Sequence, residues 1–209
     1  MKARSGVKKM GVWTHENLAC VILAGGKSTR MGYDKQTIKI DGDILIKQLI
    51  QAVHQTFDEV LIISNTPEMY EGWGLPHNVK IEKDEVQDQG PVMGLYTAFL
   101  KTKCAHVYLM ACDMPAYDLE YINSLWTAHQ KEQSDVTVSC AYDYAQPFHG
   151  IYKVDPEGLL SFIETNPGRG LNSYRRARSY TIQQIKHTVA EKLFIDINTP
   201  RDLNDYIGA

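Results

Sequence analysis

The chain has 209 residues, a formal net charge of −3 at pH 7 and 44% hydrophobic residues, which is ordinary for a soluble globular protein. A chain of this length can bury one sizeable core, so one domain is expected. The small net charge excludes a general attraction to nucleic acid or to an anionic membrane, although an anionic small molecule needs only a local group of donors. No apolar run approaches the roughly 20 residues that span a bilayer. We therefore expect neither a nucleic acid nor a membrane as partner.

The N-terminal segment and the cysteines set further limits. Residues 1–17 start with basic residues, and no apolar stretch of signal-peptide length follows. We expect them to be an extension outside the fold, with no need of an ordered structure, and residues 18–209 to form the domain. The four cysteines lack CxxC and zinc spacing, as is usual for small buried side chains in a reducing compartment: Cys20, Cys104, Cys112 and Cys140. The sequence thus predicts a cytoplasmic protein.

Along the chain, short β-branched runs alternate with longer segments of helical periodicity. Strands are predicted at residues 20–23, 60–63, 79–81, 106–110, 136–138, 148–152 and 193–195. Helices are predicted at residues 44–53, 91–102, 119–129 and 158–165 and from residue 200 onward. The basic segment 167–178 is predicted to be a loop. Thr199, Pro200 and Asp202 form a capping-box-like start for the last helix.

This alternation predicts a single-domain α/β fold. We expect a Rossmann-like three-layer sandwich whose mostly parallel sheet is covered by helices on both faces. In open sheets of this kind, ligands bind beyond the carboxyl ends of the strands. The loops of interest therefore follow Leu23, Ile63, Ile81, Ala111 and Ile195.

The loop after the first strand has the composition of a phosphate-binding segment. Gly25 and Gly26 allow the backbone to approach a ligand closely, and successive amides can form an anion-binding hollow. Three cations lie within nine residues: Lys27, Arg30 and Lys35. A polyphosphate would fit these groups. A plain glycine turn with solvated charges explains the composition equally well.

Two familiar phosphate-binding motifs do not fit this loop. Residues 26–28, GKS, imitate the end of a P-loop, but Val21 occupies the position of its first glycine. Lys27 stands where the dinucleotide-binding pattern GxGxxG requires its second glycine. The loop therefore belongs to neither class.

Asp113 is a candidate metal ligand. It follows a predicted strand and precedes Met114 and Pro115, at the expected carboxyl end of the sheet. Magnesium prefers hard oxygen ligands, commonly one or two carboxylates together with substrate phosphates. The alternative is an N-terminal cap for the next helix, which is the more frequent role of an isolated aspartate at such a position.

The segment LAGGKSTRMGYDK, residues 23–35, resembles the LAGGxSxRMGxDK loop of the molybdenum cofactor guanylyltransferases. The resemblance covers roughly residues 20–205 and implies the nucleotidyltransferase type of α/β sandwich. It also implies a loop that wraps a triphosphate, with catalytic cations at Arg30 and Lys35. The implied nucleotide-binding residues of this loop are Leu23, Ala24, Gly25, Gly26 and Lys35.

Residues 112–115, CDMP, are similar to a segment of the same family whose aspartate binds magnesium, so the resemblance makes Asp113 the implied metal ligand. Asn65 takes the place of an asparagine near the nucleotide, with a turn residue before Pro67 as the alternative.

The resemblance implies that Asp84 recognises the base of the nucleotide. It stands six residues before Gly90, as the family's base-reading aspartate precedes a GPLAG helix start. A carboxylate can accept hydrogen bonds from both N1–H and N2–H of guanine, which cytosine and adenine cannot offer. Glu85 and Asp88 are neighbouring carboxylates that compete for this assignment.

The C-terminal half is expected to bind the second substrate. Residues 146–152, QPFHGIY, and 194–200, FIDINTP, resemble two family segments. They make Asp196 and Asn198 candidates for acceptor binding, with Asp196 also a candidate second metal-facing carboxylate. The arginines of the basic segment could bind a pterin phosphate or could simply be solvated: Arg169, Arg175, Arg176 and Arg178.

The resemblance implies that GMP is transferred from GTP to molybdopterin with the help of Mg²⁺, forming molybdopterin guanine dinucleotide and pyrophosphate. Protein partners would be other molybdenum cofactor biosynthesis proteins or target molybdoenzymes. Two alternatives stay open. One is another nucleotidyltransferase, such as a molybdopterin cytidylyltransferase or a sugar-1-phosphate enzyme; the other is a non-catalytic nucleotide-binding adaptor with the same fold.

Overall fold

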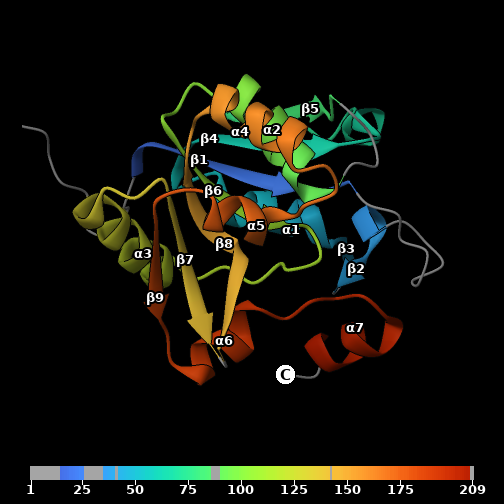
Figure 1. Cartoon of the computed structure of the whole chain (residues 1–209). Helices are drawn as coiled ribbons and strands as arrows, with labels where there is room; N and C mark the ends of the chain where they lie inside the picture. The colour runs from blue at the N-terminus through green and yellow to red at the C-terminus, as the bar shows by residue number, and fades with distance from the viewer. Residues whose placement is uncertain (1–14, 26–34, 41, 86–89, 142, 208–209) are drawn as a thin grey trace, which may run out of the picture.

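A seven-stranded sheet in the order β5-β4-β1-β6-β8-β7-β9 forms the centre of the molecule (Figure 1). The computed structural model describes residues 15–25, 35–40, 42–85, 90–141 and 143–207. The strands are β1 His15–Leu23, β2 Lys39–Ile40, β3 Asp43–Ile44, β4 Phe57–Ser64, β5 Val79–Lys83, β6 His106–Ala111, β7 Val136–Ala141, β8 Tyr144–Lys153 and β9 Tyr180–Gln184. The helices are α1 Leu45–Val53, α2 Pro91–Lys101, α3 Leu119–Glu132, α4 Pro156–Thr165, α5 Leu171–Arg176, α6 His187–Leu193 and α7 Pro200–Ile207, with 3-10 turns η1 Lys35–Thr37 and η2 Pro67–Tyr70.

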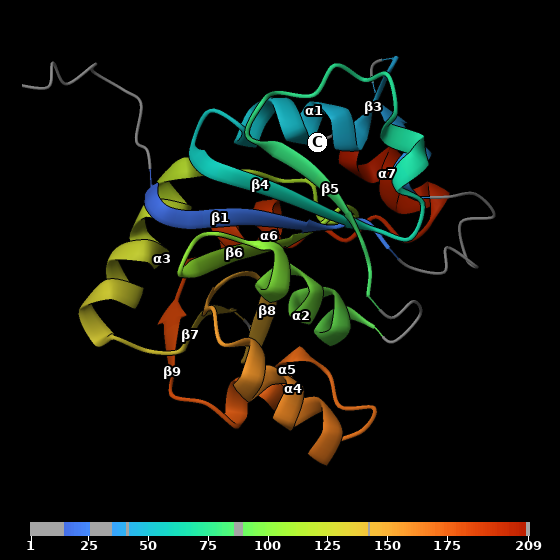
Figure 2. The same cartoon turned by 90° about the horizontal axis from the view of Figure 1, so that it is seen from above.

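Helices cover both faces of this sheet, so the predicted three-layer α/β sandwich is confirmed (Figure 2). Alternate residues of β1 point to opposite faces because successive side chains of a strand do so. Cys20 and Ile22 pack with α1 and α3, whereas Val21 and Leu23 pack with α2, α4 and α5. Burial on both faces explains why the strand reads as a continuous apolar run.

Four parallel strands bring their carboxyl ends to one edge of the sheet. β1 lies between β4 and β6, with Leu23 paired to Ile63 on one side and to Ala111 on the other. β5 runs parallel to β4 and ends beside it, where Lys83 pairs with Ser64. The loops that the sequence singled out after these strands therefore start close together.

β8 is antiparallel to its neighbours β6 and β7, which makes the sheet mostly rather than wholly parallel. Its pairing with β7 shifts register between Thr137 and Ser139, and His149 adopts a positive φ of 52° near this irregularity. The ring of His149 is fully buried, with Nδ1 2.8 Å from the hydroxyl of Tyr108, so His149 is a packing residue. Because β8 runs antiparallel to β6, its first half lies at the carboxyl edge of the sheet.

The structure corrects three predictions of secondary structure. Residues 193–195 do not form a strand: Leu193 ends α6, and the chain then enters a loop in which Ile195 packs with Ile197 in a small cluster apart from the seven-stranded sheet. The basic segment 167–178 contains the short helix α5, whose Leu171 is buried against the sheet. β1 begins at His15, so three residues of the expected extension belong to a strand.

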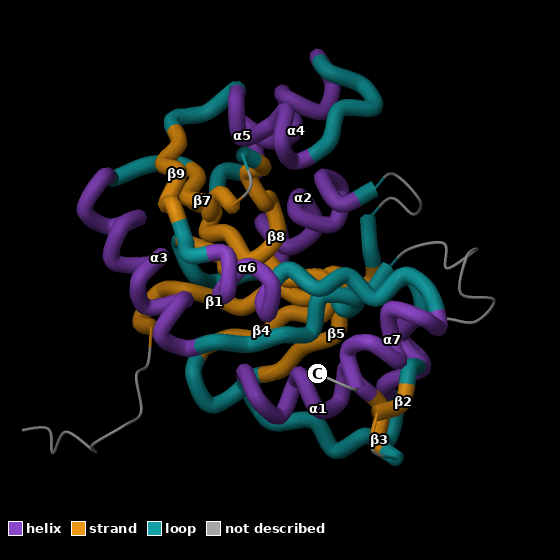
Figure 3. Tube along the Cα trace, turned by 90° about the horizontal axis from the view of Figure 1, so that it is seen from below, coloured by secondary structure: helices purple, strands orange, loops and turns teal. Residues whose placement is uncertain are grey.

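The last helix begins as predicted. Thr199 Oγ1 accepts a hydrogen bond from the amide of Asp202, and the carboxylate of Asp202 accepts from the amides of Asn198 and Thr199. Its residues Leu203 and Tyr206 pack against the β2–β3 hairpin, as Figure 3 shows for the two elements.

All four cysteines are free thiols, and three of them are buried while Cys104 is half-buried. In the described part of the chain, no helix is long and apolar enough to cross a membrane.

Candidate active site

A cleft of about 570 Å³ opens at the carboxyl edge of the parallel strands. Each of the five loops predicted from the sequence contributes at least one residue to the lining of this cleft, among them Gly25, Asn65, Asp84, Asp113 and Asp196. The order of the strands sets their order along the cleft. Asp84 lies at the β5 end, Gly25 at β1 in the middle and Asp113 after β6, on the side nearer β8.

The first part of the glycine loop is held against both neighbouring strand ends. The amide of Ala24 donates to the carbonyl of Ile63 at 2.8 Å, and the amide of Cys112 donates to the carbonyl of Leu23 at 3.0 Å. A Cβ atom on Gly25 would lie 3.2 Å from Nδ2 of Asn65, so a side chain here would crowd that amide. Glycine therefore allows the backbone to pass close to Asn65.

The end of the same loop is anchored near Asn65 by a residue that the sequence did not single out. Gln36 is buried, and its Oε1 accepts hydrogen bonds from Ser64 Oγ at 2.8 Å and Tyr70 Oη at 2.7 Å. Gly26 and Arg30 lie outside the described residues. Lys35 is the first residue of η1, and its side chain is likewise outside the described part. The roles predicted for these three residues stay predictions.

Asp84 is fixed by a second residue that the sequence analysis missed. Its Oδ1 accepts a 2.7 Å hydrogen bond from the hydroxyl of Thr97, and its amide donates to the carbonyl of Ser64 at 3.2 Å. Thr97 lies on the sheet-facing side of α2 and is fully buried. In the sequence, the only indication of this role is that Thr97 is a polar residue on an otherwise apolar face of the helix.

The helix α2 begins at the cleft. Gly90, its N-cap, has a φ of 78°, a left-handed conformation that favours glycine, and Pro91 occupies the first helical position. Both residues line the cleft together with Gly94. A Cβ on Gly94 would lie 3.0 Å from Leu23 Cδ2, so glycine permits close packing of α2 on β1.

Asp113 is not the cap of the following helix, which was the alternative to a metal ligand. The N-cap of α3 is Asp118, whose Oδ1 accepts from the amide of Tyr121 at 2.8 Å. Asp113 instead sits in a turn that directly follows β6 and lines the cleft, with Met114 N donating to Ala111 O at 3.0 Å.

The two C-terminal candidates differ in position. Asp196 lines the cleft together with Asp113. Asn198 is not among the described residues that line it, and its amide caps α7 through Asp202. In the described ranges, no group of three or more metal-ligating side chains occurs. Two carboxylates are nevertheless sufficient for magnesium, because substrate phosphates commonly complete its shell.

Tyr144 and Phe148, from the first half of β8, line the cleft on the far side of Asp113 from Asp84. Tyr144 is 58% exposed, and its hydroxyl accepts a 3.3 Å hydrogen bond from Asn172 Nδ2 of α5. Phe148 belongs to the family-like segment 146–152, whereas Tyr144 lies just before that segment and was not predicted as a site residue.

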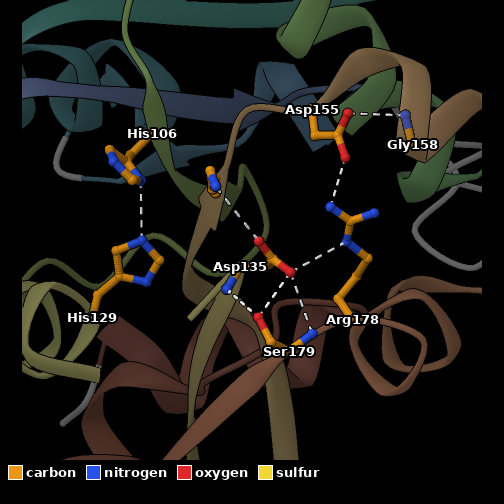
Figure 4. Close-up of polar contacts among 8 residues, drawn as sticks. His106, His129, Asp135, Asp155, Gly158, Arg178 and Ser179 are labelled. Atoms are coloured by element: carbon orange, nitrogen blue, oxygen red, sulfur yellow. Dashed lines mark hydrogen bonds and ion pairs between the residues drawn. The ribbon is translucent and has the colours of Figure 1, made fainter. Parts of the chain in front are cut away.

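The arginines of the basic segment do not line the cleft in the described part of the chain. Arg178 Nη2 lies 2.6 Å from the carboxylate of Asp155, the N-cap of α4, and Arg178 Nε lies 3.7 Å from the carboxylate of Asp135, which directly precedes β7 (Figure 4). Arg175 is buried, with its guanidinium 4.7 Å from the ring centre of Tyr180. These two arginines have structural partners, which argues against the first of the two possibilities, a contact with a pterin phosphate.

Known proteins resemble the chain in sequence and in fold. A model of the MobA-like NTP transferase domain matches residues 20–184. The molybdenum cofactor guanylyltransferase of Syntrophotalea carbinolica is 31% identical over 195 residues, which cover 90% of each chain.

Solved structures share the fold at lower identity. Molybdopterin-guanine dinucleotide biosynthesis protein A from Archaeoglobus fulgidus has a TM-score of 0.74 at 19% identity, over 91% of this chain and 97% of its own. The 2-C-methyl-D-erythritol 4-phosphate cytidylyltransferase of Francisella tularensis has a TM-score of 0.68 at 13% identity, over 91% and 98%. The solved structures show the fold alone, whereas the sequence matches show the family. The chain belongs to the MobA-like NTP transferases and, among them, to the molybdenum cofactor guanylyltransferases.

Proposed function

We propose that this nucleotidyltransferase moves GMP from GTP to the terminal phosphate of molybdopterin, which yields molybdopterin guanine dinucleotide and pyrophosphate. The observation that carries the proposal is the meeting of Asp84, Gly25 and Asp113 in one cleft, in the order that a base, a triphosphate and a metal would need. The curated relative from Syntrophotalea carbinolica bears the name of this activity.

The nucleotide would lie along the strand ends, with its base toward β5. Asp84 would accept hydrogen bonds from N1–H and N2–H of guanine. The backbone of Leu23, Ala24, Gly25 and Gly26 would surround the triphosphate, with Asn65 beside it. Arg30 and Lys35 would neutralise the phosphates, a role supported by the anchoring of both loop ends at the cleft.

Asp113 would hold Mg²⁺, with Asp196 as a second carboxylate facing it. The fit rests on two hard-oxygen donors in the same cleft. A magnesium ion bound there would supply positive charge to the phosphate oxygens during transfer.

The chain's residues would accelerate the reaction by position and charge. The attacking oxygen belongs to an ionised phosphate, so no strong general base is required, and orientation of the two substrates carries much of the effect. The amides of Gly25 and Gly26, together with Arg30 and Lys35, would stabilise charge that develops on the leaving pyrophosphate. Loss of one such cation would raise the barrier by about 3 kcal/mol, or about a hundredfold in rate.

The acceptor would occupy the part of the cleft between Asp113 and β8. Tyr144 and Phe148 offer aromatic surface to a pterin ring there, and Asp196 is the proposed polar contact. We further propose a cytoplasmic location and contacts with other molybdenum cofactor biosynthesis proteins or with target molybdoenzymes.

A pyrophosphate-release assay tests the proposal. Purified protein is incubated with Mg²⁺ and GTP, CTP or UTP, with and without molybdopterin. We expect release only with GTP and molybdopterin together. Faster release with CTP would indicate a cytidylyltransferase. Nucleotide binding without release in the presence of molybdopterin would indicate a non-catalytic adaptor.

A further inference from the structure

Thr97 lies in the core and contacts Asp84, a residue that lines the cleft. Thr97 is 0% exposed, and its Oγ1 lies 2.7 Å from Oδ1 of Asp84 and 3.0 Å from the amide nitrogen of Glu85. A buried hydroxyl is costly unless it is hydrogen-bonded. The hydroxyl of Thr97 makes two hydrogen bonds, and both go to residues that directly follow β5.

The direction of the two bonds follows from the groups involved. The amide of Glu85 can only donate, so the hydroxyl oxygen of Thr97 is the acceptor of that bond. The hydroxyl has one proton, and the carboxylate of Asp84 receives it. A bond from a hydroxyl to a charged carboxylate is stronger than one between neutral groups. Thr97 therefore fixes which way the carboxylate of Asp84 is turned.

The helix α2 ties this orientation to the phosphate loop. Gly94 packs directly on Leu23, which begins that loop, and Thr97 follows three residues later on the same face of the helix. One rigid element thus sets both the position of Leu23 and the orientation of Asp84. A base and a triphosphate joined in one nucleotide require this fixed relation.

We propose that Thr97 is a positioning residue that aligns the Asp84 carboxylate with the N1–H and N2–H edge of guanine and thereby sets the selectivity for the 2-amino group of the base. The inference rests on the proposed role of Asp84 in base reading. Both oxygens of the Asp84 carboxylate must lie in the plane of the base to accept from N1–H and N2–H. A rotated side chain therefore loses one of these two hydrogen bonds.

The test compares kcat/KM for GTP and for inosine triphosphate, which keeps N1–H but lacks the 2-amino group, with molybdopterin as acceptor. Thr97→Val retains the shape of the side chain and removes the hydroxyl. We expect it to lower the ratio of GTP to inosine triphosphate about tenfold, the order expected for one hydrogen bond to a charged group. Thr97→Ser restores the hydroxyl, and its ratio stays within about twofold of wild type.

The chain contains a matched control at the other end of α2. Thr102 Oγ1 donates to Glu59 Oε2 at 2.7 Å and accepts from the amide of Cys104 at 3.1 Å, the same pattern as Thr97 but away from the cleft. Thr102→Val should lower the melting temperature and leave the ratio unchanged. A general loss of stability is thereby separated from a loss of alignment.

Asp84→Ala distinguishes base reading by Asp84 from the positioning role of Thr97. If Asp84→Ala abolishes the preference for GTP while Thr97→Val keeps the wild-type ratio, the positioning role is wrong and base reading by Asp84 stands. If Asp84→Ala keeps the wild-type ratio, base reading by Asp84 is wrong, and the role of Thr97 falls with it. Should Thr97→Val not fold, Thr97→Ala provides the same comparison, and a wild-type ratio in that variant overturns the proposal.

Discussion

The backbone amide of Ile197 donates a 2.8 Å hydrogen bond to the backbone carbonyl of Asp113, which joins the C-terminal loop to the turn after β6. Ile197 is fully buried in a small cluster with residues of the segment that follows the glycine loop: Ile38, Ile40 and Leu45. This contact holds Asp196, one residue earlier, on the wall of the cleft that Asp113 also lines. Two carboxylates 83 positions apart in the sequence are thus brought to one site.

Asp113→Asn should lower the rate of pyrophosphate release at least about a hundredfold and leave the fold intact, because a neutral amide is a poor ligand for magnesium. Asp196→Asn should have a smaller effect, since the second carboxylate is the weaker of the two assignments. Steady-state kinetics over a range of Mg²⁺ concentrations, with melting temperatures, measure both effects.

Asp118→Asn is the control for these two variants. Asp118 caps α3 outside the cleft, and asparagine caps a helix as well as aspartate does. Its activity should equal that of wild type. Near-wild-type activity in folded Asp113→Asn would show that the metal assignment is wrong.

Tyr144→Ala should raise KM for molybdopterin by roughly tenfold and leave KM for GTP unchanged, because Tyr144 lies across Asp113 from Asp84, where we propose that the acceptor binds. Tyr144→Phe keeps the ring and loses the bond from Asn172, so it should stay close to wild type. Equal changes in both KM values would contradict an acceptor-side position for Tyr144.

Arg178→Met should lower the free energy of unfolding by about 2 kcal/mol, because it leaves the carboxylates of Asp135 and Asp155 without their shared cation. KM for molybdopterin should not change. The amide of Gly158 and the guanidinium of Arg178 lower the pKa of Asp155. The charged carboxylate therefore stabilises the folded state at neutral pH, and this contribution is lost as the pH falls through the lowered pKa. Urea unfolding at pH 7 and acceptor kinetics provide the measurements, and a raised KM would restore Arg178 as a phosphate contact.

Acid should destabilise the protein through the buried His129 and its half-buried partner His106. His129 Nε2 lies 3.0 Å from His106 Nδ1, and burial lowers the pKa of both rings, that of His129 to about 4 (Figure 4). Below its usual pKa of roughly 6.5 the unfolded chain binds a proton that the folded chain excludes, so the free energy of unfolding falls between about pH 6.5 and pH 4. The burial of His149, whose pKa is also lowered to about 4, adds to this slope.

His129→Gln should make that pH dependence shallower by removing one titrating group, whatever it costs in stability at pH 7. Urea unfolding at several pH values from 7.5 to 5 measures the slope. An unchanged slope in the variant would mean that His129 does not titrate differently in the folded and unfolded states.

Most of the sheet could be predicted from the sequence, because strands buried on both faces are written as short apolar runs. The strand at residues 60–63 and the helix at 44–53 were correctly identified for this reason. β9 was missed because it is an edge strand with two exposed hydrophobic residues, Tyr180 and Ile182, and polar neighbours. Residues 193–195 look like a strand locally, yet Leu193 ends α6 and packs with Phe194 on the main core, while Ile195 packs with Ile197 in a separate cluster.

The sequence by itself determined the kind of site: a glycine-rich loop with cations, an aspartate at a strand end and a carboxylate before a glycine-proline helix start. These are local features, since each depends on a residue and its nearest neighbours in the chain. Only the tertiary structure decided how they cooperate. The buried hydroxyl of Thr97, the anchor at Gln36 and the bond from Ile197 to Asp113 join segments distant in sequence, and such contacts arise only when the strands and helices pack.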